Sequence, residues 1–296
     1  MTACNSSRQT RVCEAFVEFK SRAAGETAYE WSEPVKLFFT YPYKLFIPHP
    51  RVRKGEPTRW VYPVVFGGGL VSGDSLEFKI KCGTGSSILL TSQAFNKVYK
   101  SLRSGVCRQI NDFTVERNSL LSVLPDLMVC FAESKYTQTQ KIRLRDPTSS
   151  IVYLDWFSSG RIAYQERWQF AYLHTLLEIY LGEELVLREN LVLEKVDGLS
   201  ISDRMKNFDV FGLLIIYGGT TLVKELKTSV LTELSKREEY GVAAESQNVF
   251  CTSLTKHEIG VVRFICADSR AAYSRIEKLL TPMFETYGGN PFFNKY

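Results

Sequence analysis

Histidine is scarce in this sequence, and several catalytic and metal-binding motifs are missing. The 296 residues contain three histidines, which lie far apart along the chain. No Gly-x-Ser-x-Gly elbow for a hydrolytic serine occurs, and no Gly-Lys-Ser/Thr phosphate loop. The nearest approach to a zinc signature is Cys251, His257 and Cys266, whose spacings are wider than zinc sites favour. The sequence therefore gives little support for hydrolase chemistry or for a structural metal ion.

Long apolar runs and paired cysteines are missing as well. The uncharged and mostly apolar stretch Val210–Val223 is shorter than the roughly 20 residues that a membrane span needs. The first eleven residues lack the apolar segment of a secretory signal. The seven cysteines are an odd number without a Cys-x-x-Cys pair, which is typical of free thiols in a reducing compartment. We expect a soluble cytoplasmic protein without a membrane segment.

Charge is mild and spread out. The net charge is +5, and the densest basic run, residues 51–54, is short. A nucleic-acid groove would need a basic stripe with interleaved aromatic residues, so we expect no nucleic-acid partner. Hydrophobic residues make up 45% of the chain, which is enough for a sizeable core.

Glycine is concentrated at positions 67, 68, 69 and 73. Such a block bends the backbone sharply or allows a close approach. A phosphate-binding loop would need a helix after the glycines, because the helix N-terminus holds the anion. Residues 75–82 instead alternate, with one parity formed by Leu76, Phe78, Ile80 and Cys82, and this pattern predicts a strand. We expect the glycines Gly67, Gly68, Gly69 and Gly73 to shape a crossing between two strands.

Period-two patterns recur up to about residue 200 and predict a mostly β protein. Prolines between residues 42 and 63 favour an extended segment there. Ile151–Phe157 is almost continuously apolar, which predicts a strand buried on both faces, and residues 178–187 predict a hairpin around Gly182-Glu183. Further strands are predicted at residues 12–19, 35–39, 61–66, 109–116, 120–124, 139–144, 162–172 and 259–265.

The pattern changes beyond about residue 200, where we expect the main helices. Between residues 220 and 240, leucine or valine recurs every four residues, and Gly241 follows as a suitable C-cap. Asp268 or Ser269 is a suitable N-cap for a second helix with an apolar face.

Two carboxylates interrupt predicted apolar strand faces. Asp74 shares its parity with Leu76, and Glu166 lies between Tyr164 and Trp168. Burying a carboxylate is costly unless a cation, a donor or water compensates. The structural alternatives are a turn aspartate at Asp74 and an ion pair of Glu166 with Arg161 or Lys97. The functional alternative is a wet internal passage lined by carboxylates.

Three further acids are candidates for the same passage. Asp155 lies within the buried run Ile151–Phe157, so it poses the same question as Glu166. Asp126 and Glu133 are expected in loops, where a solvated charge is the simpler interpretation.

Several short motifs occur in the order found in the UreD (UreH) family of urease accessory proteins. They are Tyr41-Pro42-Tyr43-Lys44, Gly67 to Asp74, Leu90-Thr91-Ser92-Gln93, Lys97-Val98-Tyr99-Lys100, Leu124-Pro125-Asp126, Tyr136-x-Gln138, and Asp155 to Arg161 with Glu166 and Trp168. The resemblance covers roughly residues 41–195; beyond residue 200 its clearest part is Val261-Val262-Arg263. We expect one UreD-like domain over residues 1–296.

The resemblance implies a β-rich, β-helix-like stack of strands in two layers with a few helices. It also implies a scaffold without catalysis of its own, which bridges apo-urease, UreF and the GTPase UreG and helps Ni²⁺ reach a carbamylated-lysine site. No tightly bound cofactor is implied, only Ni²⁺ in transit. Carboxylates on an inner face would supply hard oxygen ligands that hold a divalent ion weakly.

On this hypothesis Asp74 and Glu166 are the first candidates for a nickel route, followed by Asp155, Asp126 and Glu133. The candidates for structural or partner contacts are Gly67, Gly68, Gly69, Gly73, Gln93, Lys97, Tyr99, Arg161 and Trp168. The sequence departs from the family pattern at Phe95-Asn96, which replace a small residue and threonine, at Gln165, which replaces glycine, and at Leu127, which replaces proline.

Two other classes of function stay open. The first is a pure protein–protein adaptor, in which the acids are structural and nickel does not pass through. The second is a small-molecule enzyme that uses the loop Gly67–Asp74. The nickel route predicts that Glu166→Ala leaves the protein folded and partner-bound but lowers the nickel loading of urease.

Overall fold

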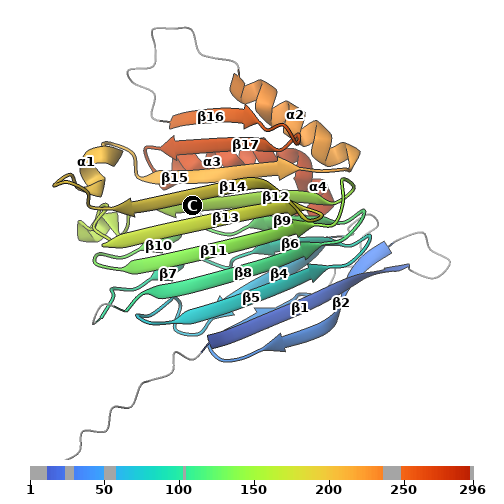
Figure 1. Cartoon of the computed structure of the whole chain (residues 1–296), viewed down its shortest axis with the longest axis horizontal. Helices are drawn as coiled ribbons and strands as arrows, with labels where there is room; N and C mark the ends of the chain where they lie inside the picture. Colours follow the sequence, from blue (N-terminus) through green and yellow to red (C-terminus); the bar gives the residue numbers. More distant parts are fainter. Residues whose placement is uncertain (1–11, 24–29, 50–57, 103–104, 236–247, 294–296) are drawn as a thin grey trace, which may run out of the picture.

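The chain forms two stacked β-sheets with helices behind the second sheet (Figure 1). The strands of the seven-stranded first sheet are, in spatial order, β14 (Glu184–Glu194), β13 (Tyr172–Leu181), β11 (Lys135–Leu144), β8 (Cys107–Val115), β5 (Ser75–Cys82), β1 (Val12–Ala23) and β2 (Glu30–Phe39). Those of the second sheet are β16 (Asn248–Leu254), β17 (Gly260–Cys266), β15 (Val210–Tyr217), β12 (Ser150–Ser158), β9 (Leu120–Leu124), β6 (Ser87–Thr91), β4 (Thr58–Val65) and β3 (Tyr43–Phe46). Two short strands, β10 (Met128–Cys130) and β7 (Asn96–Val98), extend this sheet beside β12.

This computed structural model describes residues 12–23, 30–49, 58–102, 105–235 and 248–293. Its helices are α1 (Ile201–Met205), α2 (Thr221–Ser235), α3 (Ser269–Leu280) and α4 (Phe284–Tyr287), with 3₁₀ turns at Ile162–Tyr164 and Thr281–Met283. None of the helices in these ranges is long and apolar enough to cross a membrane. The basic run at 51–54, the prolines at 50 and 57 and the expected C-cap Gly241 lie outside the described residues.

The strands stack because the chain alternates between the sheets. It passes from β4 to β5, on to β6, β8 and β9, and then to β11, β12 and β13. Successive strands within each sheet therefore pair in parallel, as β5 does with β8 and β9 with β12. Antiparallel strands end the stack, including the predicted hairpin of β13 and β14. The expected class, a mostly β, β-helix-like stack of strands in two layers with a few helices toward the C-terminus, is confirmed.

The alternation of β12 places this strand between two hydrophobic cores. Tyr153 and Phe157 point into the core between the sheets, whereas Leu154 and Trp156 point into the core under the helices. The prediction of a strand buried on both faces is therefore confirmed. Two layers of core fix the position of β12, and with it the position of Asp155.

The helical layer is held to the second sheet by apolar packing and by hydrogen bonds. Helix α3 begins at the predicted cap, where the Asp268 carboxylate accepts a hydrogen bond from the Ala271 amide at 2.8 Å. The Tyr287 hydroxyl donates to the Ser122 hydroxyl at 2.8 Å, and the Trp60 indole donates to the Tyr287 carbonyl at 2.6 Å. The outer face of the sheet is thus covered by α2, α3 and α4 (Figure 1).

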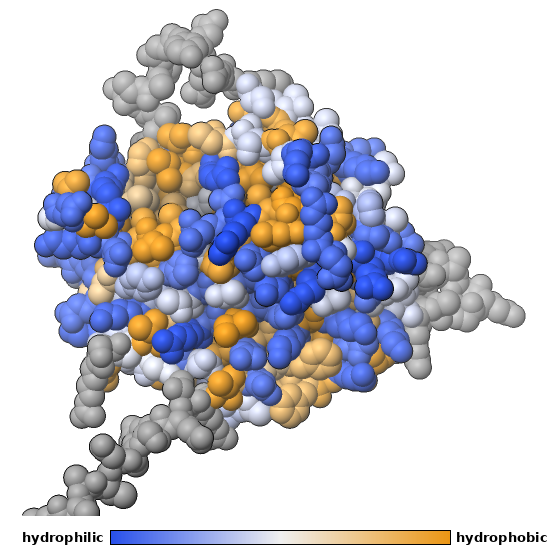
Figure 2. Space-filling model, viewed as in Figure 1, coloured by the Kyte–Doolittle hydropathy of each residue, from blue (hydrophilic) through white to orange (hydrophobic). Residues whose placement is uncertain are grey.

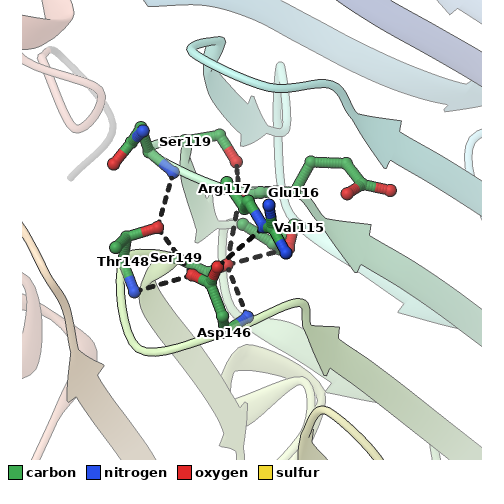
Figure 3. Close-up of polar contacts among 8 residues, drawn as sticks. Val115, Glu116, Arg117, Ser119, Asp146, Thr148 and Ser149 are labelled. Atoms are coloured by element: carbon green, nitrogen blue, oxygen red, sulfur yellow. Dashed lines mark hydrogen bonds and ion pairs between the residues drawn. The ribbon is translucent and has the colours of Figure 1, made fainter.

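Polar corners close the stack where the chain turns from one sheet to the other. Figure 3 shows two adjacent corners, after β8 and after β11. The Asp146 carboxylate accepts hydrogen bonds from the Thr148 amide at 2.9 Å and the Thr148 hydroxyl at 2.6 Å, and pairs with Arg117 at 2.9 Å. The Ser149 hydroxyl donates to the Val115 carbonyl at 3.1 Å. Hydrogen bonds between successive turns thus keep the corners in register.

Candidate functional site

The glycine block connects β4 in the second sheet to β5 in the first, as the strand-crossing interpretation predicted. Gly67 and Gly68 have positive φ angles of 93° and 72°, which glycine adopts without strain. A Cβ at Gly69 would lie 2.7 Å from the carbonyl oxygen of Lys97. That carbonyl accepts a hydrogen bond from the Leu70 amide at 2.8 Å. Because a strand follows the block, it lacks the helix N-terminus on which phosphate loops depend.

Asp74 is a turn residue. Its carboxylate accepts a hydrogen bond from the Val71 amide at 2.8 Å, and its own amide donates to the Val71 carbonyl at 3.0 Å. Asp74 precedes β5, and its neighbour Gly73 has a φ of 87°. The geometry therefore fits the structural alternative, in which an aspartate stabilises its own turn.

The predicted strand over residues 162–172 is wrong. Residues 162–164 form a 3₁₀ turn, Gln165 and Trp168 have φ angles of 60° and 56°, and β13 begins only at Tyr172. The alternating aromatic residues that suggested a strand belong to a loop. Trp168 in this loop is buried, at 3% exposed, whereas Tyr164 is 71% exposed. Strand parity therefore says nothing about Glu166.

Glu166 forms an ion pair with Arg161, one of the two partners considered from the sequence. The Arg161 Nε donates to the Glu166 carboxylate at 2.7 Å, and the Ala132 amide donates to it at 3.3 Å. The guanidinium also lies 4.0 Å from the ring centre of Phe131. The hydrogen bond from Arg161 lowers the pKa of Glu166. Glu166 is thus a charged, partnered carboxylate at the edge of the stack.

The two loop acids differ from one another. Glu133 pairs with Lys100 at 2.8 Å with its side chain 65% exposed, in line with a solvated charge. Asp126 is 2% exposed, so the expectation of a solvated charge is wrong there. Its carboxylate accepts a hydrogen bond from the Tyr273 hydroxyl at 2.9 Å. The loop is buried because α3 covers it, and a short Leu-Pro-Asp motif gives no sign of that cover.

The other predicted contact residues are spread over one end of the stack. The Tyr99 hydroxyl donates to the Gly67 carbonyl at 3.0 Å, which ties the glycine loop to the end of β7. The Trp168 indole donates to the Phe208 carbonyl at 2.9 Å and is structural. Gln93 is exposed and Lys97 half-buried. Gln93 and Lys97 line the same cavity.

That cavity has a volume of about 290 Å³ and lies between the two sheets. Its walls come from the glycine loop, from residues 90–97 and from the inner faces of β8, β11 and β12. Gln93 and Phe95 in its lining are exposed, so the cavity opens to the surface at residues 93–95. Asp126 and Asp155 line it, whereas Asp74, Glu133 and Glu166 do not.

The opening coincides with a break in the second sheet. Strand β6 ends at Thr91 and β7 begins at Asn96, while β9 ends at Leu124 and β10 begins at Met128. Strand β12 continues past both breaks and pairs with β9 on one side of the gap and with β10 on the other. Asp155 lies in the stretch of β12 between these two pairings.

Four amides and a tyrosine on the first sheet face Asp155. Gln109 and Asn111 of β8 lie in register with Gln138 and Gln140 of β11, which puts the four amides in a square on the inner face. The Gln138 amide donates to the Asp155 carboxylate at 2.9 Å. The Asn111 amide donates to Gln140 at 3.2 Å. This polar square stands inside an otherwise apolar core.

The Tyr136 hydroxyl lies between two amide oxygens of this network. Its oxygen lies 2.7 Å from Gln138 Oε1 and 2.8 Å from Gln109 Oε1, but it carries one hydrogen and donates to one acceptor at a time. When Gln138 donates to Asp155, its own oxygen accepts from Tyr136, which leaves the Gln109 oxygen in need of another donor. A polar cavity of this size can hold the water that supplies it.

Asp155 is the charged member of the network. Burial raises its pKa from the ordinary 3.8 to about 6, against the lowering effect of the hydrogen bonds from Gln138 and Tyr153. Within the described residues no lysine or arginine forms an ion pair with it. A partly desolvated carboxylate without a cation attracts one, and amide oxygens and water beside it are ligands that divalent ions accept.

Gln109, Asn111 and Gln140 were not singled out from the sequence, although a signal was present. Cys107, Phe113 and Val115 share the parity of Gln109 and Asn111 on β8, so polar residues stood at apolar positions. The pattern was hidden because both parities of β8 carry polar side chains.

The described residues contain no group of three or more His, Cys, Asp or Glu side chains placed to hold a metal ion. Cys251 is exposed and Cys266 is buried, while His257 lies 3.3 Å from Glu184. A metal ion in the cavity beside Asp155 would therefore be held by one carboxylate, neutral oxygens and water, a set of ligands that suits transient binding.

Comparison with known proteins identifies the family of this chain. A model of the UreD family, described as urease accessory protein, matches residues 17–294. Urease accessory protein D of Arabidopsis thaliana is 29% identical over 280 residues, covering 88% of this chain and 95% of the relative. The rice protein of the same name (Oryza sativa subsp. indica) is 31% identical over 205 residues, covering 69% and 66%. UreD of Sorangium cellulosum is 36% identical over 198 residues, covering 67% and 59%.

The fold is thus a two-layer stack of strands with a polar cavity between the sheets and helices over the second sheet. The family match extends over nearly all of the described residues, and the similarity to the Arabidopsis protein covers 88% of the chain. The chain belongs to the UreD family of urease accessory proteins.

Proposed function

We propose that this protein acts in the cytoplasm as a maturation scaffold that bridges apo-urease and a complex of UreF and the GTPase UreG. We further propose that it lets Ni²⁺ pass toward the urease active site, without chemistry of its own. Family membership supports the accessory role. The observation that carries the nickel route is Asp155, a carboxylate that has no ion-pair partner among the described residues and lies in a polar cavity at a break in the second sheet.

The physical case for transit is that the site binds weakly. One carboxylate, amide oxygens and water give a divalent ion hard ligands without the closed set of charged ligands that retains it. The raised pKa of Asp155, about 6, means that a proton competes with the ion near neutral pH. An ion therefore leaves such a site as readily as it enters.

The proposed route runs past Asp155 and Asp126 and not past the two acids ranked first from the sequence. Asp74 is engaged by its own turn and Glu166 by Arg161, and both lie outside the cavity lining. An acid that is already satisfied by a strong partner is a poor ligand for a passing ion.

The test is nickel loading of urease with Asp155→Asn, which keeps the size and one acceptor of the side chain. We expect this variant to pull down urease and its UreF and UreG partners normally while urease receives several-fold less nickel. Glu166→Ala and Asp146→Asn are the matched controls and should leave loading near the wild-type level. Normal loading with Asp155→Asn would remove the route. A loss confined to Glu166→Ala would return the route to the acid ranked first from the sequence.

A pure adaptor is the second candidate, because apolar side chains are exposed on the outer surface. On the face formed by the first sheet, Figure 2 shows apolar areas among charged ones. In strand β14, Leu185 and Val192 are 42% and 41% exposed. Exposed apolar areas of this kind are typical of protein–protein contacts. Normal nickel loading with Asp155→Asn would favour this function.

A further inference from the structure

We propose that Tyr273 is a positioning residue that decides whether the Asp126 carboxylate is available to a cation in the cavity. This inference rests on the proposed nickel route. Asp126 lines the cavity, and its carboxylate accepts a hydrogen bond from the Tyr273 hydroxyl of α3 at 2.9 Å. Both residues are buried, at 2% and 0% exposed. A donor from the helical layer thus occupies one of the two acids at the break in the sheet.

The backbone of Asp126 is held by contacts of its own, besides the hydrogen bond that its carboxylate accepts from Tyr273. The Asp126 amide donates to the Ser92 hydroxyl at 3.1 Å, and the Asn96 amide group donates to the Asp126 carbonyl at 3.4 Å. These contacts stay within the second sheet and hold the residue at the cavity wall. Loss of the Tyr273 hydroxyl therefore removes one donor from the Asp126 carboxylate, while the contacts with Ser92 and Asn96 still hold the residue at the cavity wall.

Tyr273 is itself fixed by residues at the mouth. Its ring meets Trp156 edge-on with ring centres 4.5 Å apart, and lies 6.3 Å from the ring of Phe95. The Leu127 amide donates to its hydroxyl oxygen at 3.4 Å. A proline at position 127 would lack that N–H.

The hydroxyl acts as a neutral donor. Burial, and then the nearby Asp126 charge, raise the pKa of Tyr273 well above its ordinary range, so the phenol keeps its proton at physiological pH. A hydrogen bond from such a donor uses a lone pair and spreads the charge that a cation would otherwise meet. Any movement of α3 away from the sheet, for example on partner binding, would then add a second carboxylate to the cavity.

The test is titration of Ni²⁺ into the purified full chain by calorimetry. Tyr273→Phe keeps the ring against Trp156 and removes the hydroxyl, and we expect it to bind Ni²⁺ roughly tenfold tighter than wild type. Asp126→Asn alone should change affinity less than about twofold, because the carboxylate is already engaged. Asp126→Asn in the Tyr273→Phe background should abolish the whole gain. Thermal unfolding confirms that each variant is folded.

Equal affinity of Tyr273→Phe and wild type, with Asp155→Asn still weaker than both, would overturn the control by Tyr273 and leave the nickel route standing. If Tyr273→Phe does not fold, the Ni²⁺ affinity of Asp126→Asn decides the question alone. An affinity at least fivefold weaker than that of wild type would show that the Asp126 carboxylate already binds Ni²⁺ in the wild-type protein, and would overturn the proposal. Failure of both wild type and Asp155→Asn to bind Ni²⁺ would instead reject the route and this proposal with it.

Discussion

Asp146 and Asp155 lie at opposite ends of one turn of the stack, and their environments have opposite effects. Asp146 sits at an exposed corner, where hydrogen bonds from Thr148 lower its pKa (Figure 3). Asp155 faces the interior, where burial raises its pKa to about 6. The first acid is stabilised as a charge by its surroundings, and the second is destabilised.

The difference lies in where the hydrogen-bond donors come from. Asp146 finds its donors two residues away in the chain, through ordinary turn chemistry. Asp155 depends on Gln138 of the opposite sheet, which in turn depends on Tyr136. The hydrogen bonds from Thr148 to Asp146 form within one turn of the chain. The hydrogen bonds around Asp155 join two sheets and border a cavity with room for water or an ion. A buried carboxylate of this kind lowers the stability of the fold, which is the pattern expected if the proposed nickel route is right.

The largest expected effect on stability comes from removing the cavity charge. The folded Asp155 keeps its proton up to about pH 6 and the unfolded one only up to its ordinary pKa of 3.8. Between these values the folded state binds more protons, so the free energy of unfolding falls as pH rises. Asp155→Asn should therefore be more stable than wild type at pH 8, by up to about 3 kcal/mol.

Urea unfolding at pH 8 and pH 4 measures this difference. We expect the advantage of Asp155→Asn to shrink toward zero at pH 4, because the wild-type carboxyl is then protonated in the folded state. An advantage that is equal at both pH values would mean that packing and not charge is responsible.

A smaller effect is expected from the tyrosine that orients the network. Tyr136→Phe keeps the buried ring and deletes the hydroxyl that reaches Gln138 and Gln109. We expect it to lower the free energy of unfolding by about 1–2 kcal/mol, because a buried amide oxygen loses its donor. In a Gln138→Leu background the same change should cost clearly less, which a double-mutant cycle measures. Equal costs in both backgrounds would show that Tyr136 does not act through Gln138.

The same contrast explains how much of the molecule the sequence predicts. Strands and helix ends came from local patterns: the double burial of Ile151–Phe157 and the Asp268 cap of α3 depend on neighbours in the chain. Alternation failed at residues 162–172, because a loop with positive φ at Gln165 and Trp168 places its aromatic residues by tertiary contacts.

The cavity was only partly predictable. The sequence raised Asp155 as a carboxylate in a buried strand, but the amide square needs the register of β8 against β11, which no local pattern supplies. The burial of Asp126 depends on α3, whose Tyr273 lies far along the chain, so it could not be predicted from the residues around Asp126. Features that depend on pairing between distant strands were therefore missed, and features that depend on one strand were found.

The smallest effect is expected at the corner, and it has the opposite sign. Asp146→Asn keeps an acceptor for Thr148 and deletes the charge that faces Arg117. The pKa of folded Asp146 lies below its ordinary value, so its contribution to stability is present above that value and is lost as pH falls through the folded pKa. Asp146→Asn should therefore be slightly less stable than wild type at pH 7, and the two should converge in acid. Thermal melts from pH 7 down to pH 3 test this, and a difference in stability between variant and wild type that widens in acid would contradict it.

High salt should also reduce this difference at pH 7, because the ion pair of Asp146 with Arg117 is exposed and screened. The effect of Asp155→Asn on stability should hardly respond to salt.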